Sequence, residues 1–224
     1  MGDINQLLYI QKYANQFHGP YLEVGSRDYG NTQDLRSLFA HKARYIGTDM
    51  AQGPGVDVVL DLTADFELID NTLQELRFGT IFCLSVLEHC ELPFKMAENL
   101  TRLLAPGGSI CLSVPFAWKF HGYPSDYWRF TQEGVKKLFQ KLEFNPAQTV
   151  AATSKAGEMR SVDQEVGLIP FSSKAHWRRR HPLRGLSAVL LRTLARLGIW
   201  SWLCGYRYVL APTNLSMIGT LRVD

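Results

Sequence analysis

The sequence lacks the features that mark unusual classes of protein. Its 224 residues carry a formal net charge of only +3, and they contain no internal repeat and no low-complexity segment. With 46% hydrophobic residues, the chain is too apolar for a disordered segment and shows no coiled-coil composition. Because no linker separates a first half from a second, the length predicts a single domain over 1–224.

Cysteine is scarce, and its four copies show no metal-ligand spacing. Cys83, Cys90 and Cys111 lie in or beside apolar runs, where a thiol serves as a small hydrophobic side chain. No grouping of His, Asp and Glu has a convincing ligand spacing either, so no metal site is predicted. We expect a reduced protein of the cytoplasm.

A secretory signal is also missing from the start of the sequence. Residues 1–17 have acid and amide side chains where such a signal needs a basic start and a long apolar stretch. Apolar residues recur there at helical spacing from Ile4 to Phe17, after Asp3 as a plausible N-cap. The sequence therefore predicts an amphipathic helix within 1–18.

Short apolar runs alternate with helical patterns over most of the chain. The runs are continuous, as in parallel strands that are covered on both faces. Helical patterns fall at 31–40, 66–76, 93–104 and 131–141. This order predicts βαβ units and a doubly wound, mostly parallel α/β sheet. The predicted strands are 20–25, 43–49, 56–62, 78–86, 107–115, 147–153 and 214–223.

Two glycines mark the turn after the first predicted strand, in "YLEVGSRDYGNT" at 21–32. Gly25 and Gly30 would let the backbone approach a ligand without a Cβ in the way. A helix starting near Asn31 would point free N–H groups at the same place. The stretch lacks the third glycine of a dinucleotide fingerprint and the Gly-Lys-Ser/Thr of a phosphate loop. An ordinary turn is therefore nearly as well supported as a nucleotide site.

Carboxylates are predicted at the ends of the first three strands, at Glu23, Asp49 and Asp61. Ligands of open α/β sheets bind at this edge, and Asp49 has the position from which a carboxylate accepts hydrogen bonds from ribose hydroxyls. Three acids would repel a pyrophosphate and favour a nucleoside with a cationic tail. For Asp61, a solvated strand end is an equally good interpretation.

Over 20–142 these stretches resemble the class I S-adenosylmethionine-dependent methyltransferases, of the type 11-like kind. "LEVGSRDYG" is similar to the first motif of that family, "YIGTDM" to its ribose-binding motif, and "VDVVLDLT" to the segment whose end lies against adenine. The most specific stretch is 78–115, where "LEH" and "LAPGG" stand in the family's order between two strands. "GSRDYG" departs from the Gly-x-Gly-x-Gly of many members.

The resemblance implies a Rossmann-like sheet of seven strands with the last one antiparallel, the cofactor S-adenosyl-L-methionine, and methyl transfer. It implies that the glycine turn admits the methionine part of the cofactor and that Glu23 orders its ammonium, directly or through water. The backbone near Ser85 would meet the methionine part as well. The cofactor-binding residues predicted in this way are Glu23, Gly25, Ser26, Gly30, Asp49, Met50, Asp61, Leu62, Ser85 and Val86.

The methyl acceptor is expected beside "HGYPSDYWRFT", which follows the fifth predicted strand. This stretch is similar to segments of bacterial methyltransferases of glycan and natural-product pathways. His121 is the side chain best suited to remove the proton of an acceptor hydroxyl near neutral pH. Asp126 would orient His121 or contact the acceptor. His121 and Asp126 are thus the predicted catalytic residues.

Other interpretations of the same residues stay open. Asp126 could pair with Arg129 to pin the loop, in which case Tyr127, Trp128 and Phe130 would belong to the core. His89 is a second candidate base, although packing at a helix start explains it equally well.

The segment 154–211 follows no clear alternation and is predicted to be an insertion or lid before the last strand. Within it, 177–203 combines arginines, leucines and two tryptophans in an amphipathic pattern that is too interrupted by arginine for a membrane span. This pattern suits a lid, a homodimer contact or a helix on an anionic membrane surface. In the last case the protein would be peripheral at the inner membrane surface.

The sequence as a whole predicts an enzyme that methylates a small molecule or a sugar or glycan, on oxygen. One alternative is an RNA methyltransferase that uses the basic segment 177–184, although a general nucleic-acid binder is usually more basic than this chain. The other is a non-catalytic methyltransferase-like protein that binds a membrane or another protein.

Overall fold

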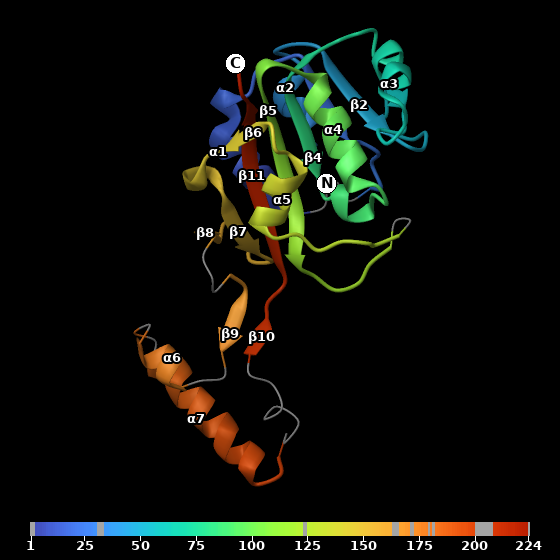
Figure 1. Cartoon of the computed structure of the whole chain (residues 1–224). Coiled ribbons are helices and arrows are strands. Elements are labelled where there is room, and N and C mark those ends of the chain that lie inside the picture. Colours follow the sequence, from blue (N-terminus) through green and yellow to red (C-terminus); the bar gives the residue numbers. More distant parts are fainter. Residues whose placement is uncertain are drawn as a thin grey trace. The chain divides into compact units, whose positions relative to one another are not determined.

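A computed structural model describes residues 3–30, 34–122, 125–162, 166–170, 173–178, 180, 182–199 and 208–223. The chain divides into two compact units (Figure 1). The first consists of Met1–Gln164 and Pro212–Asp224, and the second of Glu165–Ala211.

The first unit is built around a mixed sheet, which has nine strands in its described part. Five strands run parallel in the order β3-β2-β1-β4-β5, and the last strand, β11, pairs antiparallel with β5. β11 in turn pairs with β7, which leads to β8 at the edge. The doubly wound α/β class and the antiparallel last strand are therefore confirmed. The strands are β1 (Tyr21–Val24), β2 (Tyr45–Asp49), β3 (Val58–Val59), β4 (Phe78–Leu84), β5 (Leu104–Ala117), β6 (Leu142–Phe144), β7 (Val150–Thr153), β8 (Met159–Ser161) and β11 (Thr213–Leu221).

The predicted number of seven strands is wrong, because the sheet also contains β6 and β8. Each has three residues, which is too short for a periodic pattern. The third predicted strand, 56–62, is present only as the two residues of β3. There the carboxylate of Asp57 accepts hydrogen bonds from Gly47 N at 2.7 Å and from Arg36 at 2.5 Å. Backbone hydrogen bonds also continue beside β3, from Asp57 N to Gly47 O at 2.8 Å and from Leu60 N to Asp49 O at 2.9 Å.

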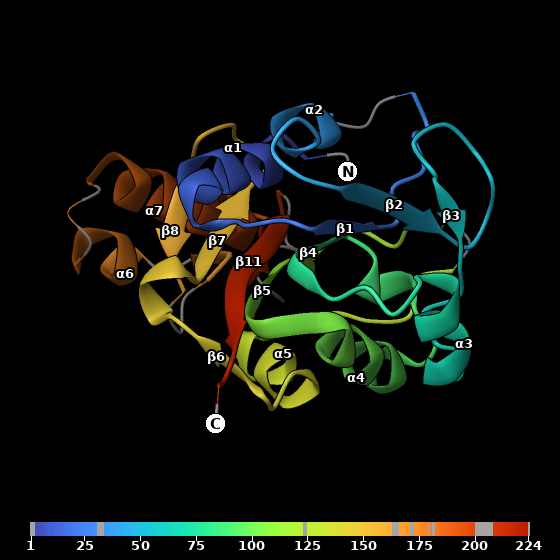
Figure 2. The ribbon, with the colours of Figure 1, turned by 90° about the horizontal axis from the view of Figure 1, so that it is seen from above.

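Helices cover both faces of the sheet (Figure 2). α1 (Ile4–Tyr13) and α2 (Arg36–Phe39) lie on one face, and α3 (Phe66–Thr72), α4 (Pro93–Leu103) and α5 (Gln132–Leu138) on the other. Three short 3₁₀ turns, η1 (Ala14–Gln16), η2 (Leu87–His89) and η3 (Pro146–Gln148), complete the unit. The predicted helix at 31–40 begins later, at Arg36, and 31–33 lie outside the described residues.

α1 begins as predicted and is tied to distant parts of the chain. Asp3 caps it by accepting a hydrogen bond from Asn5 N at 2.9 Å, and the same carboxylate accepts another from Asn214 Nδ2 at 3.0 Å. The buried side chain of Asn5 donates to Thr153 O at 2.7 Å and accepts from Gly157 N at 2.7 Å. The first helix is therefore held by the β7–β8 hairpin and by β11.

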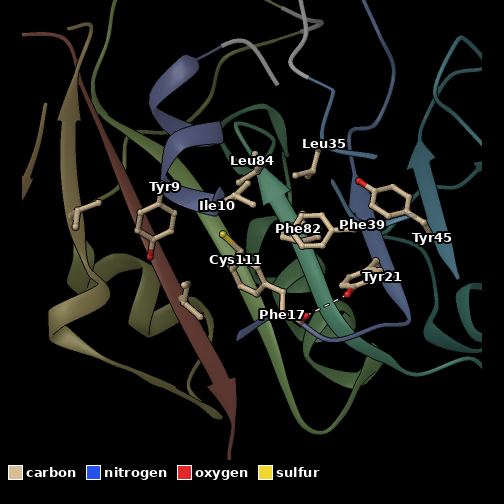
Figure 3. Packing of buried hydrophobic residues seen from close by; sticks show 12 residues of the cluster. Tyr9, Ile10, Phe17, Tyr21, Leu35, Phe39, Tyr45, Phe82, Leu84 and Cys111 are labelled. Atoms are coloured by element: carbon tan, nitrogen blue, oxygen red, sulfur yellow. Dashed lines mark hydrogen bonds between the residues drawn. The ribbon is translucent and has the colours of Figure 1, made fainter. Parts of the chain in front are cut away.

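Aromatic side chains fill the space between the sheet and the helices α1 and α2 (Figure 3). The ring of Phe39 lies 5.0 Å from those of Tyr21 and Phe82, and Phe17 meets Phe82 edge-on at 5.3 Å. Each such ring contributes roughly 1.5–3 kcal/mol by its burial. This cluster holds β1 and β4 in place, and with them the turns that follow.

Register brings the ends of the central strands together. Val24 of β1 pairs with Thr48 of β2 and with Cys83 of β4. Because these strands are parallel, the residues after them emerge at one edge of the sheet.

The second unit is described by itself. β9 (Leu168–Pro170) pairs antiparallel with β10 (Tyr208–Leu210), and α6 (Ser173–Arg178) and α7 (Pro182–Arg196) lie between them in the sequence. Gly185 of α7 leaves no room for a Cβ against the indole of Trp177. Leu183, Leu186 and Leu190 are exposed on another face of α7. In the described part of the chain, no helix combines the length and the apolar character needed to cross a membrane.

Candidate active site

A cavity of about 1050 Å³ lies at the carboxyl ends of β1, β2 and β4. We distinguish a strand half, lined by Gly25, Asp49, Asp61 and Ser85 with their neighbours, from a loop half, lined by Glu88, His89, Trp118, His121 and Tyr127. This edge is where open α/β sheets bind ligands. The predicted site residues that line the cavity are Gly25, Asp49, Met50, Asp61, Leu62, Ser85, Val86 and His121.

The turn after β1 requires glycine at Gly25. Its φ of 69° lies in the left-handed region, and a Cβ would come within 2.6 Å of Val86 Cγ2. The N–H groups of Gly25 and Ser26 both donate to Thr48 O, at 2.8 and 3.0 Å. The chain thus leaves the strand sharply and keeps its backbone at the wall of the cavity.

Three predicted cofactor residues, one in β1 and two in the turn after it, lie outside the cavity lining. Glu23 Oε2 accepts a hydrogen bond from Tyr45 Oη at 2.7 Å. Burial raises the pKa of Glu23, and the hydrogen bond from Tyr45 opposes part of that rise. Ser26 is buried, and its Oγ has no hydrogen-bond partner in the described structure. Gly30 N donates to Asp28 Oδ1 at 2.7 Å. The cofactor roles of Glu23, Ser26 and Gly30 stay predictions.

Two carboxylates stand at the wall of the strand half. Asp49 Oδ1 accepts a hydrogen bond from Ala51 N at 2.9 Å, and Asp61 Oδ1 accepts from Thr63 N at 2.8 Å. Each acid is thus fixed by the turn that follows it. Both line the cavity, so this half offers acceptors for the hydroxyl groups of a ligand.

Ser85 follows β4 in an unusual conformation for a non-glycine residue, with a φ of 55°. Its Oγ accepts a hydrogen bond from Gln6 Nε2 at 2.7 Å, and Gln6 also donates to Ser113 Oγ at 3.0 Å. Strained backbone of this kind gathers at ligand sites. α1 therefore braces the strand half, a contact that the sequence did not reveal.

The loop after β5 docks on the η2 turn by hydrogen bonds. Tyr127 N donates to Glu88 O, and Trp128 Nε1 donates to Cys90 O, both at 2.8 Å. Phe130 is buried, as the core interpretation predicted. For Tyr127 and Trp128 that interpretation is wrong, because they are 49% and 41% exposed, and Tyr127 lines the cavity. Both residues hold the loop through polar groups, the backbone N–H of Tyr127 and the indole N–H of Trp128, so neither ring needs to enter the core.

Asp126 and Arg129 form a clamp within this loop, as one interpretation of the sequence predicted. Arg129 Nη1 and Nη2 lie 2.5 and 2.7 Å from the two carboxylate oxygens of Asp126. These hydrogen bonds hold the pKa of Asp126 well below its usual range. Asp126 Oδ2 also accepts from His121 N at 2.9 Å and lies 3.2 Å from His121 Nδ1. Asp126 is outside the cavity lining, so it can position His121 without touching a ligand.

Glu88, His89 and His121 come together in the loop half. Glu88 is 1% exposed, and burial raises its pKa to about 8. His89 Nδ1 lies 2.6 Å from Ser125 O, and the rings of His89 and His121 meet edge to face at 4.8 Å. Burial lowers the pKa of His89. Glu88 was not predicted as a site residue, although it stands in the "LEH" stretch that carried part of the family resemblance.

Further lining residues were also missed. Arg27 and Tyr29 lie inside the glycine turn, so the sequence did contain a signal for them. Asp3, Ile4 and Asn214 come from the two ends of the sequence, and no local pattern could join them to the site.

No family model matches the sequence, and the search of curated proteins found no match. Solved structures do match. A candidate methyltransferase of Bacillus halodurans has a TM-score of 0.56 and 12% identity, covering 96% of this chain and 98% of its own. The 1,6-didemethyltoxoflavin-N1-methyltransferase of Burkholderia thailandensis, with bound 1,6-didemethyltoxoflavin and S-adenosylhomocysteine, has a TM-score of 0.53 and 10% identity, covering 98% and 77%.

A third match is a SAM-dependent methyltransferase of Archaeoglobus fulgidus, with a TM-score of 0.51 and 14% identity over 96% of this chain and 94% of that one. At such identities the comparisons concern the fold. They confirm, at that level, the resemblance found in the sequence.

Proposed function

Because the chain has the fold of the class I S-adenosylmethionine-dependent methyltransferases, we propose that it binds S-adenosyl-L-methionine and methylates an oxygen of a small molecule or glycan. The observation that carries the proposal is the cavity, whose lining includes Gly25, Asp49 and Ser85. One matched structure holds S-adenosylhomocysteine in complex with a small heterocyclic acceptor, which supports this class of ligands.

The strand half would hold the cofactor. Asp49 would accept hydrogen bonds from the ribose hydroxyls, and Asp61 and Leu62 would lie along the adenine. Gly25 leaves room for the methionine part, beside the strained backbone of Ser85. Since one carboxylate oxygen of Glu23 already binds Tyr45, Glu23 would reach the ammonium through water. Once bound, the cofactor supplies a methyl group on a good leaving group, so the protein mainly has to align the acceptor.

The loop half would hold the acceptor and remove its proton. His121 Nδ1 faces the Asp126 carboxylate and Lys119 O, both at 3.2 Å, and these oxygens can only accept. In the neutral ring Nδ1 therefore carries the proton, and Nε2 keeps a lone pair for the acceptor hydroxyl. Asp126 would stabilise the imidazolium that forms. Trp118 and Tyr127 supply aromatic walls for a ring-shaped acceptor.

The test is calorimetric titration of S-adenosyl-L-methionine and S-adenosylhomocysteine into the wild type and Asp49→Ala. We expect dissociation constants in the micromolar range, an ordinary affinity at about −8 kcal/mol, and at least a tenfold loss in the variant. Asp65→Ala removes an acid outside the cavity lining and serves as the control. Equal affinity in Asp49→Ala, or no binding to folded wild type, would contradict the proposal.

A further inference from the structure

We propose that Glu88, His89 and His121 bind a divalent transition-metal ion, with Zn²⁺ the best match, in the loop half of the cavity. One ligand atom of each side chain lies within 4.8 Å of the others, and all three residues line the cavity. The proposal that the ion binds is argued from these three residues and does not require the proposed function. Its role in methyl transfer rests on the proposed function.

The donor set indicates which ions fit. Two imidazoles and one carboxylate are the ligands of many catalytic zinc sites, which keep a fourth position open. The same set accepts other divalent first-row ions, whereas Ca²⁺ and Mg²⁺ prefer six or more oxygens. Metal–ligand bonds of about 2.0–2.1 Å require donors closer than 4.8 Å. Rotation of the Glu88 side chain and a small shift of the loop that carries His121, with its ring orientation kept, would bring them there.

Both histidines are already oriented as metal ligands are. His89 Nδ1 donates to Ser125 O, and His121 Nδ1 faces Asp126 and Lys119 O. Because these oxygens only accept, Nδ1 carries the proton and Nε2 has the free lone pair in each neutral ring. Metal-binding histidines usually donate their second nitrogen to a carboxylate or carbonyl in this way.

Glu88 provides an independent observation. Its side chain is 1% exposed, and Oε2 has no hydrogen-bond partner in the described part of the chain. A buried polar group without a partner is costly and rare in native proteins. The cation of the neighbouring loop, Arg129, is already engaged by Asp126. A bound ion would give Oε2 its missing partner.

The open position of the ion would take the acceptor oxygen. Coordination weakens the O–H bond, so the proton leaves to solvent water at lower pH than it would from a free hydroxyl. The oxygen then forms a bond to the methyl carbon while the bond between that carbon and sulfur breaks, which yields the methyl ether and S-adenosylhomocysteine. In the loaded protein His121 acts as a ligand, whereas without the ion it would act as the base.

The experiment is titration of Zn²⁺ into protein stripped with a chelator, followed by calorimetry and, with Co²⁺, by visible absorption. We expect one ion per chain and at least a tenfold loss of affinity in both Glu88→Gln and His121→Ala. His41→Ala removes an exposed histidine and serves as the control. Thermal unfolding checks that each variant is folded, and Glu88→Gln keeps the size of the buried side chain.

Unchanged Zn²⁺ affinity in both variants, or no binding to the wild type, would overturn the metal site. S-adenosyl-L-methionine is titrated into the same samples to separate the two proposals. Cofactor binding without Zn²⁺ binding would refute the metal site alone, while Zn²⁺ binding without cofactor binding would refute the proposed function alone.

Discussion

The strand half and the loop half of the cavity are held in place by different forces. In the strand half, Gly25 follows β1 and Asp49 ends β2, so backbone register sets their positions. In the loop half, His89 Nδ1 bonds to Ser125 O, 36 positions away, and the loop that carries Tyr127 is held by bonds such as that from Trp128 Nε1 to Cys90 O, 38 positions away. The strand half should therefore resist the loss of one side chain, whereas the loop half should not.

The largest effect is expected from a change that breaks the strand half itself. Gly25→Ala forces a Cβ against Val86 and a left-handed φ on alanine, which together cost about 2–4 kcal/mol of unfolding free energy. Binding of S-adenosyl-L-methionine should be lost. Urea unfolding and calorimetry measure the two effects.

Gly30→Ala is the matched control for Gly25→Ala. Its φ of 84° is also left-handed, but a Cβ there has nothing within 4 Å. We expect a cost of about 1 kcal/mol from the backbone alone. Equal losses in the two variants would show that Val86 does not constrain the turn.

Removing the clamp should damage the loop half and spare the strand half. Arg129→Ala leaves Asp126 without its two strongest partners and frees the carbonyls of Trp118 and Lys119, at a cost of about 2 kcal/mol. Arg129→Lys should recover little, since an ammonium cannot bind both carboxylate oxygens in the same way.

The informative readout for Arg129→Ala is the ratio of two affinities. Zn²⁺ binding should weaken at least tenfold, because His121 loses the orientation that Asp126 gives it, while S-adenosyl-L-methionine binding should change less than threefold. A loss of cofactor binding as large as that in Gly25→Ala would mean that the two halves are not independent.

Removing the contact by which α1 braces the strand half should have a smaller effect on cofactor binding. Gln6→Ala removes the hydrogen bonds to Ser85 and Ser113 and should weaken S-adenosyl-L-methionine binding by about 1 kcal/mol, or roughly fivefold. Gln11→Ala changes an exposed glutamine of the same helix and should leave the affinity unchanged. An equal loss in both would assign the effect to the helix as a whole.

The smallest effect concerns Glu23. Its folded-state pKa is raised, so its contribution to stability is fully present below the unfolded pKa of about 4.3 and is lost as the pH rises through the folded value. Glu23→Gln should therefore gain stability relative to the wild type between pH 4 and pH 7. Urea unfolding at both pH values measures this, with the exposed Glu98→Gln as control. A stability difference between Glu23→Gln and the wild type that does not change with pH would contradict this prediction.

This difference in how the two halves are held in place also explains which site residues the sequence could predict. Gly25, Asp49 and Ser85 each end a local apolar run, so a strand pattern suffices to place them at one edge of the sheet. Asp126 and Arg129 are three positions apart, so their pairing was open to prediction as well.

The Glu88–His89–His121 cluster could not be predicted in the same way. It depends on how the loop after β5 folds back on η2, and this is decided by backbone hydrogen bonds such as that from Tyr127 N to Glu88 O. Such bonds leave no trace in residue type. The exposed ring of Tyr127 has the same cause, since aromatic character alone favoured the core.

The attachment of α1 sets an order for folding. Asn5 binds the carbonyl of Lys155, 150 positions away, and Asp3 binds Asn214, 211 positions away. Contacts across such separations form late, because the loop between their ends has to close first. Because β11 comes last of these partners in the chain, the docking site of α1 is complete only once β11 has been synthesised. α1 is thus made well before it is fixed, and the Gln6 contact with Ser85 completes the strand half only then.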